Sequence, residues 1–255
     1  EAGSVIAGDL ASLPDVEVQG YDPAEVGTPA GVVRHDRPDA AVAGADLVLG
    51  VTAAADARAA LVQALDAIPR GAIYADLATA PAGLERSLAA TAAGAGLGFT
   101  DVALMAPVHG TGLRTPALAS GPAARAFVAT MGPLGMPVEH AGDEPGMAAT
   151  RKLLRSIVVK GLTALVVETM QAAEAAGLAA ETWDNVVGQI AAADEELVRR
   201  LVAGTGRHAS RRVNEMEAAA ELLAELGVEP LMASATAARL RLVAAGASTV
   251  PSLPG

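Results

Sequence analysis

The hydrophobic pattern of this chain changes near residue 143, and this change limits the folds available to it. Before that point, short runs rich in β-branched residues alternate with alanine-rich segments of helical period; after it, only helical segments follow. Strands separated by helices of this length indicate βαβ units and a mainly parallel, doubly wound sheet. The sequence therefore predicts an α/β domain at residues 1–142 and an all-α domain at residues 143–255.

The expected elements follow from this pattern. Strands are predicted at Val16–Asp22, 31–35, Asp46–Thr52, Ala72–Thr79, Gly98–Leu104, Ala117–Gly121 and Pro137–Gly142. Helices are predicted at the N-terminus, at Asp56–Ile68, after Pro81, from Asp143 to Gly177, and at 181–202, 209–226 and 230–245, before a frayed tail. Asp143 can cap the helix of about 30 residues that starts there, with Pro145 in its first turn and Gly177 at its end. A helix of this length is expected to bridge domains or to line an oligomer interface.

Composition excludes several classes of function. The net charge of −11 argues against a nucleic-acid partner or an anionic membrane surface. No window offers the roughly 18 uncharged apolar residues of a membrane span. The absence of cysteine excludes disulfides and thiolate chemistry, and agrees with a cytoplasmic location. No spacing of His, Asp and Glu predicts a metal site.

The lysines are confined to one predicted helix. The chain has two, Lys152 and Lys160, against sixteen arginines. A desolvated ammonium can lose its proton near neutrality, whereas a guanidinium cannot, so lysine is suited to acid/base work. On a helix, Lys152, Ser156 and Lys160 fall within about 80° of one another. The sequence predicts a reactive stripe here; the alternative is an ordinary charged helix surface.

The N-terminal segment resembles the later part of a dinucleotide-binding fingerprint. Gly3 stands in the first turn of the first helix, and Asp22 ends the next strand, 19 residues later. In a Rossmann-type βαβ unit a glycine at such a place permits close helix–strand packing, and an acid about 20 residues on accepts from the ribose hydroxyls. The first strand and two glycines of such a unit are absent from the sequence, so we expect the fingerprint to be cut through. The alternative is a helix start and a turn-forming Asp-Pro pair.

Small and hydroxyl residues at two further strand ends fit a bound cofactor. Thr52 and Ala53 follow one strand and Thr79 follows the next, although each also suits an ordinary turn. Asp22 favours NAD over NADP, because a carboxylate repels the 2′-phosphate. Arg34 and Arg37, just beyond, could reverse this preference. The expected cofactor is therefore NAD or NADP, with NAD favoured.

The layout resembles the β-hydroxyacid dehydrogenase superfamily, which includes 6-phosphogluconate and 3-hydroxyisobutyrate dehydrogenases, and in particular an uncharacterised phosphogluconate-dehydrogenase-like branch. The resemblance covers nearly the whole chain and is most specific at residues 146–156, where Lys152 follows Gly146 at the spacing of the family's catalytic lysine. Ser156 takes the place of an asparagine. Met105 stands where the family has a substrate-binding serine, in the segment Asp101–Pro107.

The resemblance implies a Rossmann domain, an all-α domain and a homodimer packed through the α domain. It also implies hydride transfer between nicotinamide and a small hydroxy acid or related alcohol, with Lys152 as general acid/base and Ser156 holding the substrate oxygen. Asn214 is expected in a segment similar to the family's Lys-Asp helix. Further candidates for substrate binding are His109 and Arg114 in the Met105–Pro116 loop, Lys160 and Arg212. Lys160 could instead pair with Glu168 or Glu215. Solvated surface positions explain these candidates equally well.

Two other functions remain open at this point. An imine reductase-like enzyme would keep the cofactor but would not need Lys152 as its proton donor. A catalytically silent dinucleotide-binding sensor or partner protein would explain the missing serine and asparagine. The lysine at position 152 favours the alcohol/carbonyl enzyme over the imine reductase.

Overall fold

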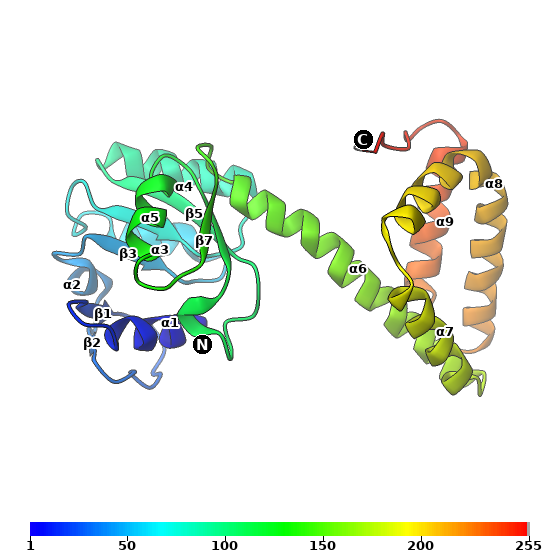
Figure 1. Ribbon diagram of the computed structural model, residues 1–255, viewed down its shortest axis with the longest axis horizontal. Helices are drawn as coiled ribbons and strands as arrows, with labels where there is room; N and C mark the ends of the chain where they lie inside the picture. The colour runs from blue at the N-terminus through cyan, green and yellow to red at the C-terminus, as the bar shows by residue number, and fades with distance from the viewer. Residues whose placement is uncertain (254–255) are drawn as a thin grey trace. The chain divides into compact units, whose positions relative to one another are not determined.

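The computed structural model describes residues 1–253, and it divides into two compact units, Glu1–Ser156 and the part that begins at Ile157 (Figure 1). The division falls within the helix α6, Met147–Ala175. The predicted assignment of a cofactor domain to residues 1–142 and a substrate and dimer domain to 143–255 stays a prediction. Pro254 and Gly255, the end of the predicted frayed tail, lie outside the described residues.

The first unit is built on parallel strands, as the sequence predicts. A five-stranded sheet has the order β3-β4-β5-β6-β7, and a two-stranded parallel sheet pairs β1 with β2. Only the β5–β6 pair of the larger sheet is antiparallel. The strands are β1 Val18–Gly20, β2 Val32–Arg34, β3 Leu47–Gly50, β4 Ile73–Asp76, β5 Gly98–Leu104, β6 Ala117–Ser120 and β7 Val138–Gly142.

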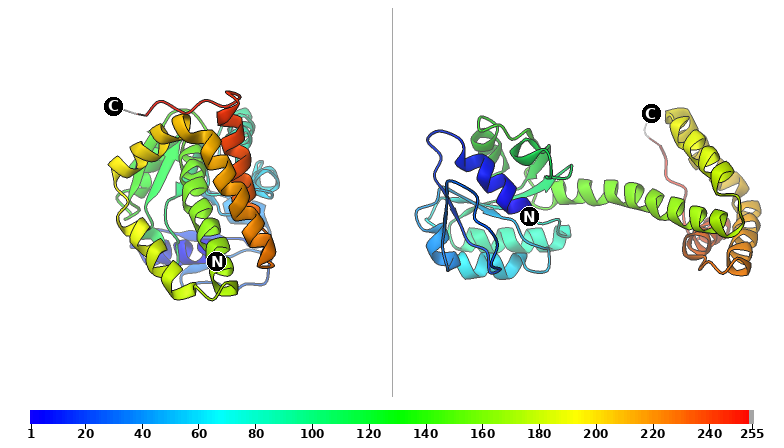
Figure 2. Two further views of the ribbon diagram at one scale, coloured as in Figure 1. Left: turned by 90° about the vertical axis from the view of Figure 1, so that its right-hand side faces the viewer. Right: turned by 90° about the horizontal axis from the view of Figure 1, so that it is seen from below.

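Helices cover both faces of the larger sheet (Figure 2). The helices α1 (Ala2–Ala11) and α5 (Ala124–Met131) pack on one face, together with Val102 of β5. The helices α2 (Pro38–Val42), α3 (Ala57–Ala64) and α4 (Ala82–Gly94) share the other core with Tyr74 and Phe99. Because side chains alternate between faces along a strand, these two cores define a doubly wound α/β unit.

The start of α6 differs from the sequence prediction. The helix begins at Met147, after Gly146 in the left-handed region at φ 92°, so Asp143 and Pro145 lie outside it. The carboxylate of Asp143 instead accepts from His140 Nε2 at 2.9 Å and pairs with Arg125. The prediction was wrong because the caps of this helix come from strands, through long-range hydrogen bonds described below. The end was predicted correctly: Gly177 has φ 73°, and Leu178 N–H donates back to the Ala173 carbonyl.

The second unit is helical throughout its described elements, as predicted, but one break is misplaced. After α6 come α7 (Ala179–Ala191), α8 (Glu195–Glu225) and α9 (Leu231–Ala244), and α8 and α9 run side by side (Figure 1). The predicted break at residues 203–208 lies inside α8, and the real one is at 192–194, where Asp194 caps α8 through Leu197 N–H. Gly204, inside the predicted break, is buried, so its missing side chain serves close packing within α8.

Three short elements of the first unit were not predicted: α2, α5 and a 3₁₀ turn, η1, at Gly112–Arg114. The turn η1 lies within the loop of residues 105–116 that the sequence marks as irregular. Among residues 1–253, no helix combines the length and the apolar character that a membrane span requires.

Candidate functional site

Three parallel strands bring most of the predicted cofactor positions to one edge of the sheet. Gly50 of β3 is in register with Asp76 of β4, which is in register with Asp101 of β5. Thr52 and Ala53 stand two and three residues after the end of β3, and Thr79 follows β4 before α4 begins. The carboxyl edge of a doubly wound sheet is where ligands bind in such folds. The sequence prediction and the topology therefore agree on the edge.

The N-terminus of α1 lies at the same edge. A Cβ built on Gly3 would lie 3.5 Å from Val51 Cβ, just beyond the end of β3. The first turn of this helix thus packs on the strand that leads to Thr52. The hydroxyl Oγ1 of Thr52 is buried and has no hydrogen-bond partner among residues 1–253. A buried hydroxyl without a partner is unusual in a folded protein and fits a polar ligand group at this place.

The start of α6 is tied to the row of strand residues that contains Gly50, Asp76 and Asp101. Asp101 accepts hydrogen bonds from Gly146 N–H (3.1 Å), from Ala149 N–H (3.0 Å) and from the hydroxyl of Ser120. Ser120 Oγ in turn accepts from Ala148 N–H at 2.9 Å. These bonds satisfy three of the N–H groups that a helix start leaves without partners.

Lys152 lies one turn beyond this anchor. It follows the buried Ala148 by four residues and Ala149 by three, so it lies within about 60° of both around the helix. Its side chain is half-buried, and so is that of Ser156, one turn further on. The two predicted catalytic residues thus share the helix face that begins at the sheet.

The loop of residues 105–116 is held at both ends by side chains from distant helices. Arg155 of α6 donates to the Met105 carbonyl at 2.6 Å, and Asp9 of α1 accepts from Leu113 N–H at 2.7 Å. A Cβ on Gly112, which has φ 54°, would overlap the Asp9 carboxylate. Inside the loop, Thr111 bonds Pro107 O and the Thr115 hydroxyl. The loop is therefore a fixed structure that spans from the end of β5 to α1.

The predicted substrate residues of this loop differ in burial. Met105 is half-buried beside the end of β5, whereas His109 and Arg114 are exposed. The loop thus places Met105 next to the carboxyl edge. Whether His109 and Arg114 bind a substrate stays a prediction.

Asp22 stands two residues after β1, and its carboxylate makes a local turn. Asp22 Oδ1 accepts from Ala24 N–H at 2.9 Å, as the turn-forming alternative requires. Arg34 donates to the carbonyls of Asp22, Ala24 and Val26, and Arg37 pairs with Asp39. Both arginines that could favour a 2′-phosphate are therefore engaged with other groups.

Three predicted substrate residues lie in the second unit. Lys160 and Asn214 are exposed, and Arg212 is half-buried and donates to Thr205 Oγ1 at 2.7 Å. The carboxylates considered as partners of Lys160 have other roles. Glu168 accepts from Met232 N–H (2.7 Å) and Ala233 N–H (2.9 Å), which caps α9, and Glu215 pairs with Arg211.

Sequence reasoning missed a group of buried polar residues under the carboxyl edge. Asp76, Glu85 and Ser120 are 0% exposed and Asp101 is 1% exposed. The signal was present in the sequence, because Asp76 and Asp101 each interrupt an apolar strand, in AIYADLAT and GFTDVAL. Acidic residues are almost never fully buried unless they are paired, so each of these positions indicated a specific role.

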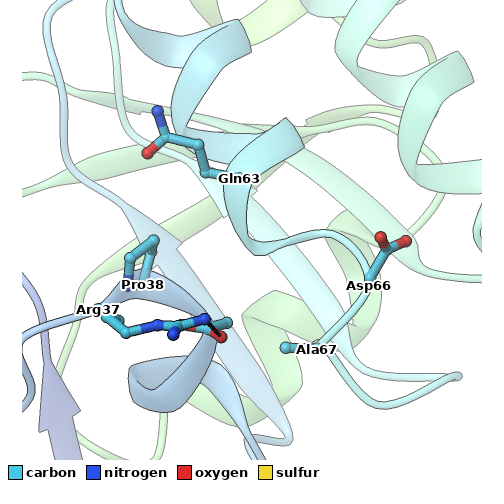
Figure 3. A pocket seen from close by; sticks show the side chains of 6 residues that line it. Arg37, Pro38, Gln63, Asp66 and Ala67 are labelled. Carbon is cyan, nitrogen blue, oxygen red and sulfur yellow. Dashed lines mark hydrogen bonds and ion pairs between the residues drawn. The ribbon is translucent and has the colours of Figure 1, made fainter.

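One surface hollow lies away from this edge. It has a volume of about 500 Å³ and lies between α2 and α3, where Arg37, Pro38, Asp39, Gln63, Asp66 and Ala67 line it (Figure 3). Arg37 is already paired with Asp39, and none of the predicted site residues borders the hollow. Across the part of the chain that the structure describes, no group of His, Asp and Glu is arranged to hold a metal ion.

Comparison with solved structures identifies the fold. An imine reductase from Streptomyces aurantiacus superposes with a TM-score of 0.78 at 20% identity, over 98% of this chain and 93% of that one. A conserved protein described as structurally similar to 3-hydroxyacid dehydrogenases covers 98% of this chain and 97% of its own, at 23% identity and a TM-score of 0.58. The fold is that of the 3-hydroxyacid dehydrogenases. The resemblance that the sequence indicates, and the predicted α/β unit followed by helices, are confirmed.

Further matches extend this 3-hydroxyacid dehydrogenase-like assignment. A variant of an imine reductase from Myxococcus stipitatus in complex with NAD⁺ superposes with a TM-score of 0.77 at 18% identity, over 96% of this chain and 91% of that one. The imine reductase from the same organism in complex with NADP⁺ superposes with a TM-score of 0.70, at the same identity and coverage. A conserved hypothetical protein from Sinorhizobium meliloti matches at 27% identity over 94% of this chain and 84% of its own, with a TM-score of 0.61. The fold is thus one that nicotinamide-dependent oxidoreductases use.

Sequence comparisons cover shorter parts. Residues 173–243 match the model of a domain of unknown function, DUF1932. An uncharacterized 28.5 kDa protein of Methanothermus fervidus is 28% identical over 102 residues, which are 40% of this chain and 41% of that protein. This chain therefore matches less than half the length of that relative.

Proposed function

We propose that this chain is an NAD(P)-dependent oxidoreductase that acts on the CH–OH or C=O carbon of a small hydroxy acid or related alcohol, with Lys152 as general acid/base. The observation that carries the proposal is the anchoring of α6 by Asp101 and Ser120, level with the ends of β3 and β4. This anchoring starts the helix at the carboxyl edge of the sheet, where we propose that the cofactor binds, with Lys152 one turn away.

The residues present at this edge fit a nicotinamide dinucleotide. The first turn of α1 offers N–H groups to a pyrophosphate, and Gly3 permits its close packing on Val51. The buried hydroxyl of Thr52, which has no partner among the described residues, would gain one from a bound cofactor. Ala53 and Thr79 would complete the contact surface. When bound, the nicotinamide supplies or accepts the hydride.

The chemistry assigned to the chain's own residues is a proton transfer. In oxidation, Lys152 takes the proton of the substrate hydroxyl; in reduction, it gives a proton to the carbonyl oxygen. Ser156 donates a hydrogen bond to the same oxygen, with a shorter reach than the asparagine of the resembled family. Met105 presents a thioether where that family has a serine, which favours a substrate less polar at that point.

The engaged arginines near Asp22 support a preference for NAD. The guanidinium of Arg34 is bound to three carbonyls and Arg37 to Asp39, so neither is a ready partner for a 2′-phosphate. We expect NADH to bind more tightly than NADPH in a fluorescence titration, and Asp22→Ala to reduce the difference. Equal affinities in the wild type would contradict this assignment.

Lys152→Ala, with Arg151→Ala as a matched control, tests the proposed reaction. General acid–base catalysis contributes roughly 10²–10⁴-fold, so oxidation of a hydroxy-acid panel should fall by about that factor in Lys152→Ala. Arg151 is an exposed neighbour on the same helix, and its variant should keep the wild-type rate. Equal rates in all three proteins would remove Lys152 from the mechanism. Binding of NADH with no turnover of any substrate would favour the sensor alternative.

A second candidate is reduction of a C=N bond. It is favoured by the imine reductases among the superposed structures, with TM-scores of 0.70 to 0.78. The same set of variants separates the two reactions when a panel of cyclic imines is added. An imine reductase would consume imines at a rate that Lys152→Ala leaves nearly unchanged, and it would not oxidise hydroxy acids.

We further propose that the partner of this chain is a second copy of itself, joined through the helical part. Along α6, Ile157, Val158 and Val159 are 69%, 70% and 51% exposed, although they point to different sides of the helix. On α7, Trp183, Val187 and Ile190 form an exposed apolar stripe. A helix that is apolar all round is normally buried. Because the run 157–167 carries one charge, Lys160, a copy of the same apolar surface is a suitable partner.

Light scattering after size-exclusion chromatography tests this assembly. The wild type should elute as a dimer, and Val158→Asp should give monomer or aggregate. Val62→Asp is the matched control, since Val62 is a valine of α3 that is 55% exposed and lies outside the proposed interface. A monomeric wild type would contradict the proposal.

A further inference from the structure

The fold gathers three carboxyl groups behind the carboxyl edge. Asp76 and Asp101 are register partners on β4 and β5, and they extend the row of Tyr74 and Phe99, whose rings stack at 6.5 Å on the same face. The helix α4 covers this face and contributes Glu85 from its first turn. All three carboxyl groups are excluded from solvent.

The three groups differ in how they are satisfied. Asp101 accepts from two N–H groups of α6 and from the Ser120 hydroxyl, so its negative charge is well supported. None of the four carboxyl oxygens of Asp76 and Glu85 receives a hydrogen bond of normal geometry from the described residues. Two buried, ionised carboxylates without donors would cost many kcal/mol, which a folded protein avoids by keeping a proton.

We propose that Asp76 and Glu85 share one proton in the folded protein, with neutral Glu85 donating to the Asp76 carboxylate, and that this hydrogen bond positions the turn of residues 77–81. The turn carries Thr79 and leads to Ala82, the first residue of α4. A Cβ on Gly146 would lie 2.7 Å from the Cα of Ala82, so the place of this turn also decides where α6 begins. The shared proton thus helps to position both the turn that carries Thr79 and the helix that carries Lys152. The importance of this positioning for cofactor binding and catalysis rests on the proposed function.

The charges around the pair favour this protonation. Burial, followed by the charges of Asp76 and Asp101, raises the pKa of Glu85 to about 9. Burial also raises the pKa of Asp76, to about 6, with Asp101 adding to the rise and the nearby N–H of Ala78 opposing it. Tyr74 faces the same cluster, and burial together with the two carboxylates raises its pKa, so it stays neutral. No cation is among the groups that shift the two acids.

The sign of the pH effect follows from these directions. The folded state keeps a proton on Glu85 that the unfolded chain releases above about pH 4.5. Between that pH and about 9 the folded state binds more protons, so its stability falls as the pH rises and levels off above. Below about pH 6, the titration of Asp76 adds to this loss of stability with rising pH.

Infrared spectroscopy and thermal unfolding of three variants test the inference. Glu85→Gln keeps a neutral donor to Asp76 and removes the titration, Glu85→Ala removes the donor, and Glu139→Gln changes an exposed glutamate on β7. At neutral pH, the wild type and Glu139→Gln should show the C=O stretch of a protonated carboxyl that Glu85→Gln lacks. The unfolding temperature should decline from about pH 5 to about pH 9 in the wild type and Glu139→Gln, whereas in Glu85→Gln it should stay nearly level above about pH 6, where Asp76 no longer titrates.

Several outcomes would overturn the proposal. These are the absence of the protonated carboxyl band in the wild type, the same pH profile in Glu85→Gln as in the wild type, or an equal loss of stability in Glu85→Gln and Glu85→Ala. Titration with NADH tests the effect on cofactor binding. Glu85→Gln should bind NADH with the affinity of the wild type, and Glu85→Ala should bind it several-fold more weakly. If no protein binds NADH, the proposed function fails, while the infrared and unfolding results still decide whether the proton is shared.

Discussion

Replacing Gly146 by alanine tests the junction on which the proposed site depends. Gly146 has φ 92°, and an added Cβ would lie 2.7 Å from both the Cα and the Cβ of Ala82 and 3.1 Å from its carbonyl oxygen. The left-handed backbone costs about 1–2 kcal/mol for a residue with a Cβ. Overpacking against a backbone that cannot move freely costs about 1–3 kcal/mol more. The expected loss is therefore about 2–5 kcal/mol of unfolding free energy.

The matched control is Gly83→Ala, one residue further along α4. An added Cβ there would have Arg86 Nη2 at 4.0 Å, an ordinary van der Waals distance, and the backbone is helical. Alanine within a helix is favoured over glycine by about 0.5–1 kcal/mol, so this variant should be slightly more stable than the wild type.

Thermal unfolding followed by circular dichroism measures the difference. At about 2–4 °C per kcal/mol for a unit of this size, Gly146→Ala should unfold roughly 4–20 °C below the wild type, and Gly83→Ala slightly above it. Because Gly146 N–H also bonds Asp101, the start of α6 and with it Lys152 should shift, which would lower turnover more than cofactor affinity. A melting temperature of Gly146→Ala equal to that of Gly83→Ala would refute the close packing of α6 on α4.

Other predictions concern the remaining long-range contacts. Gly112→Ala should destabilise the wild type but cost less in an Asp9→Ala background, because its Cβ would overlap the Asp9 carboxylate; a double-mutant cycle of urea unfolding with no coupling would contradict this. Glu168→Ala should lower stability by about 1–3 kcal/mol by removing two acceptors at the start of α9, and Glu168→Gln by less, as hydrogen exchange of α9 amides would report. Thr52→Val should leave the stability of the cofactor-free protein unchanged or raise it, because the Thr52 hydroxyl has no hydrogen-bond partner among residues 1–253. The same substitution should weaken NADH binding, and an unchanged affinity for NADH would place Thr52 outside the cofactor site.

The elements that the sequence predicts well are those with a strong local signal. The strand Gly98–Leu104 was predicted with its observed bounds, because its mostly apolar run of seven residues is bounded by Gly98 and by the irregular loop that starts at Met105. The end of α6 was found because Gly177 supplies the left-handed conformation that a helix end needs. Its start was missed because its caps, Asp101 and Ser120, lie 45 and 28 residues away from the amides they bind. No local pattern identifies a cap at such a distance, whereas Asp143 has the local features of one.

The same limit applies to the candidate site. The strand ends that hold Thr52 and Thr79 follow from the alternation of strands and helices, and Lys152 follows from its resemblance to a catalytic lysine. Asp9 and Arg155, which fix the 105–116 loop, could not be assigned this way, since each acts on a backbone group of a segment far along the chain. Glu85 was missed for a further reason: on a helix surface it reads as an ordinary solvated charge, and only the fold shows that α4 turns it toward the sheet.

The position of Lys152 is determined by a rigid core and not by loops. A helix turns about 100° per residue, so an anchor at Ala148 and Ala149 sets the direction of residue 152 as long as the helix is regular. The anchor consists of a carboxylate and a hydroxyl on two neighbouring strands, and both are excluded from water. A shift of the lysine therefore requires breaking buried hydrogen bonds, and those to the Asp101 carboxylate are charge-assisted and worth about 1.5–3 kcal/mol each. Such a scaffold suits a residue that has to meet a substrate atom within a few tenths of an ångström, and it gives the acid/base assignment a physical basis beyond the spacing of Gly146 and Lys152.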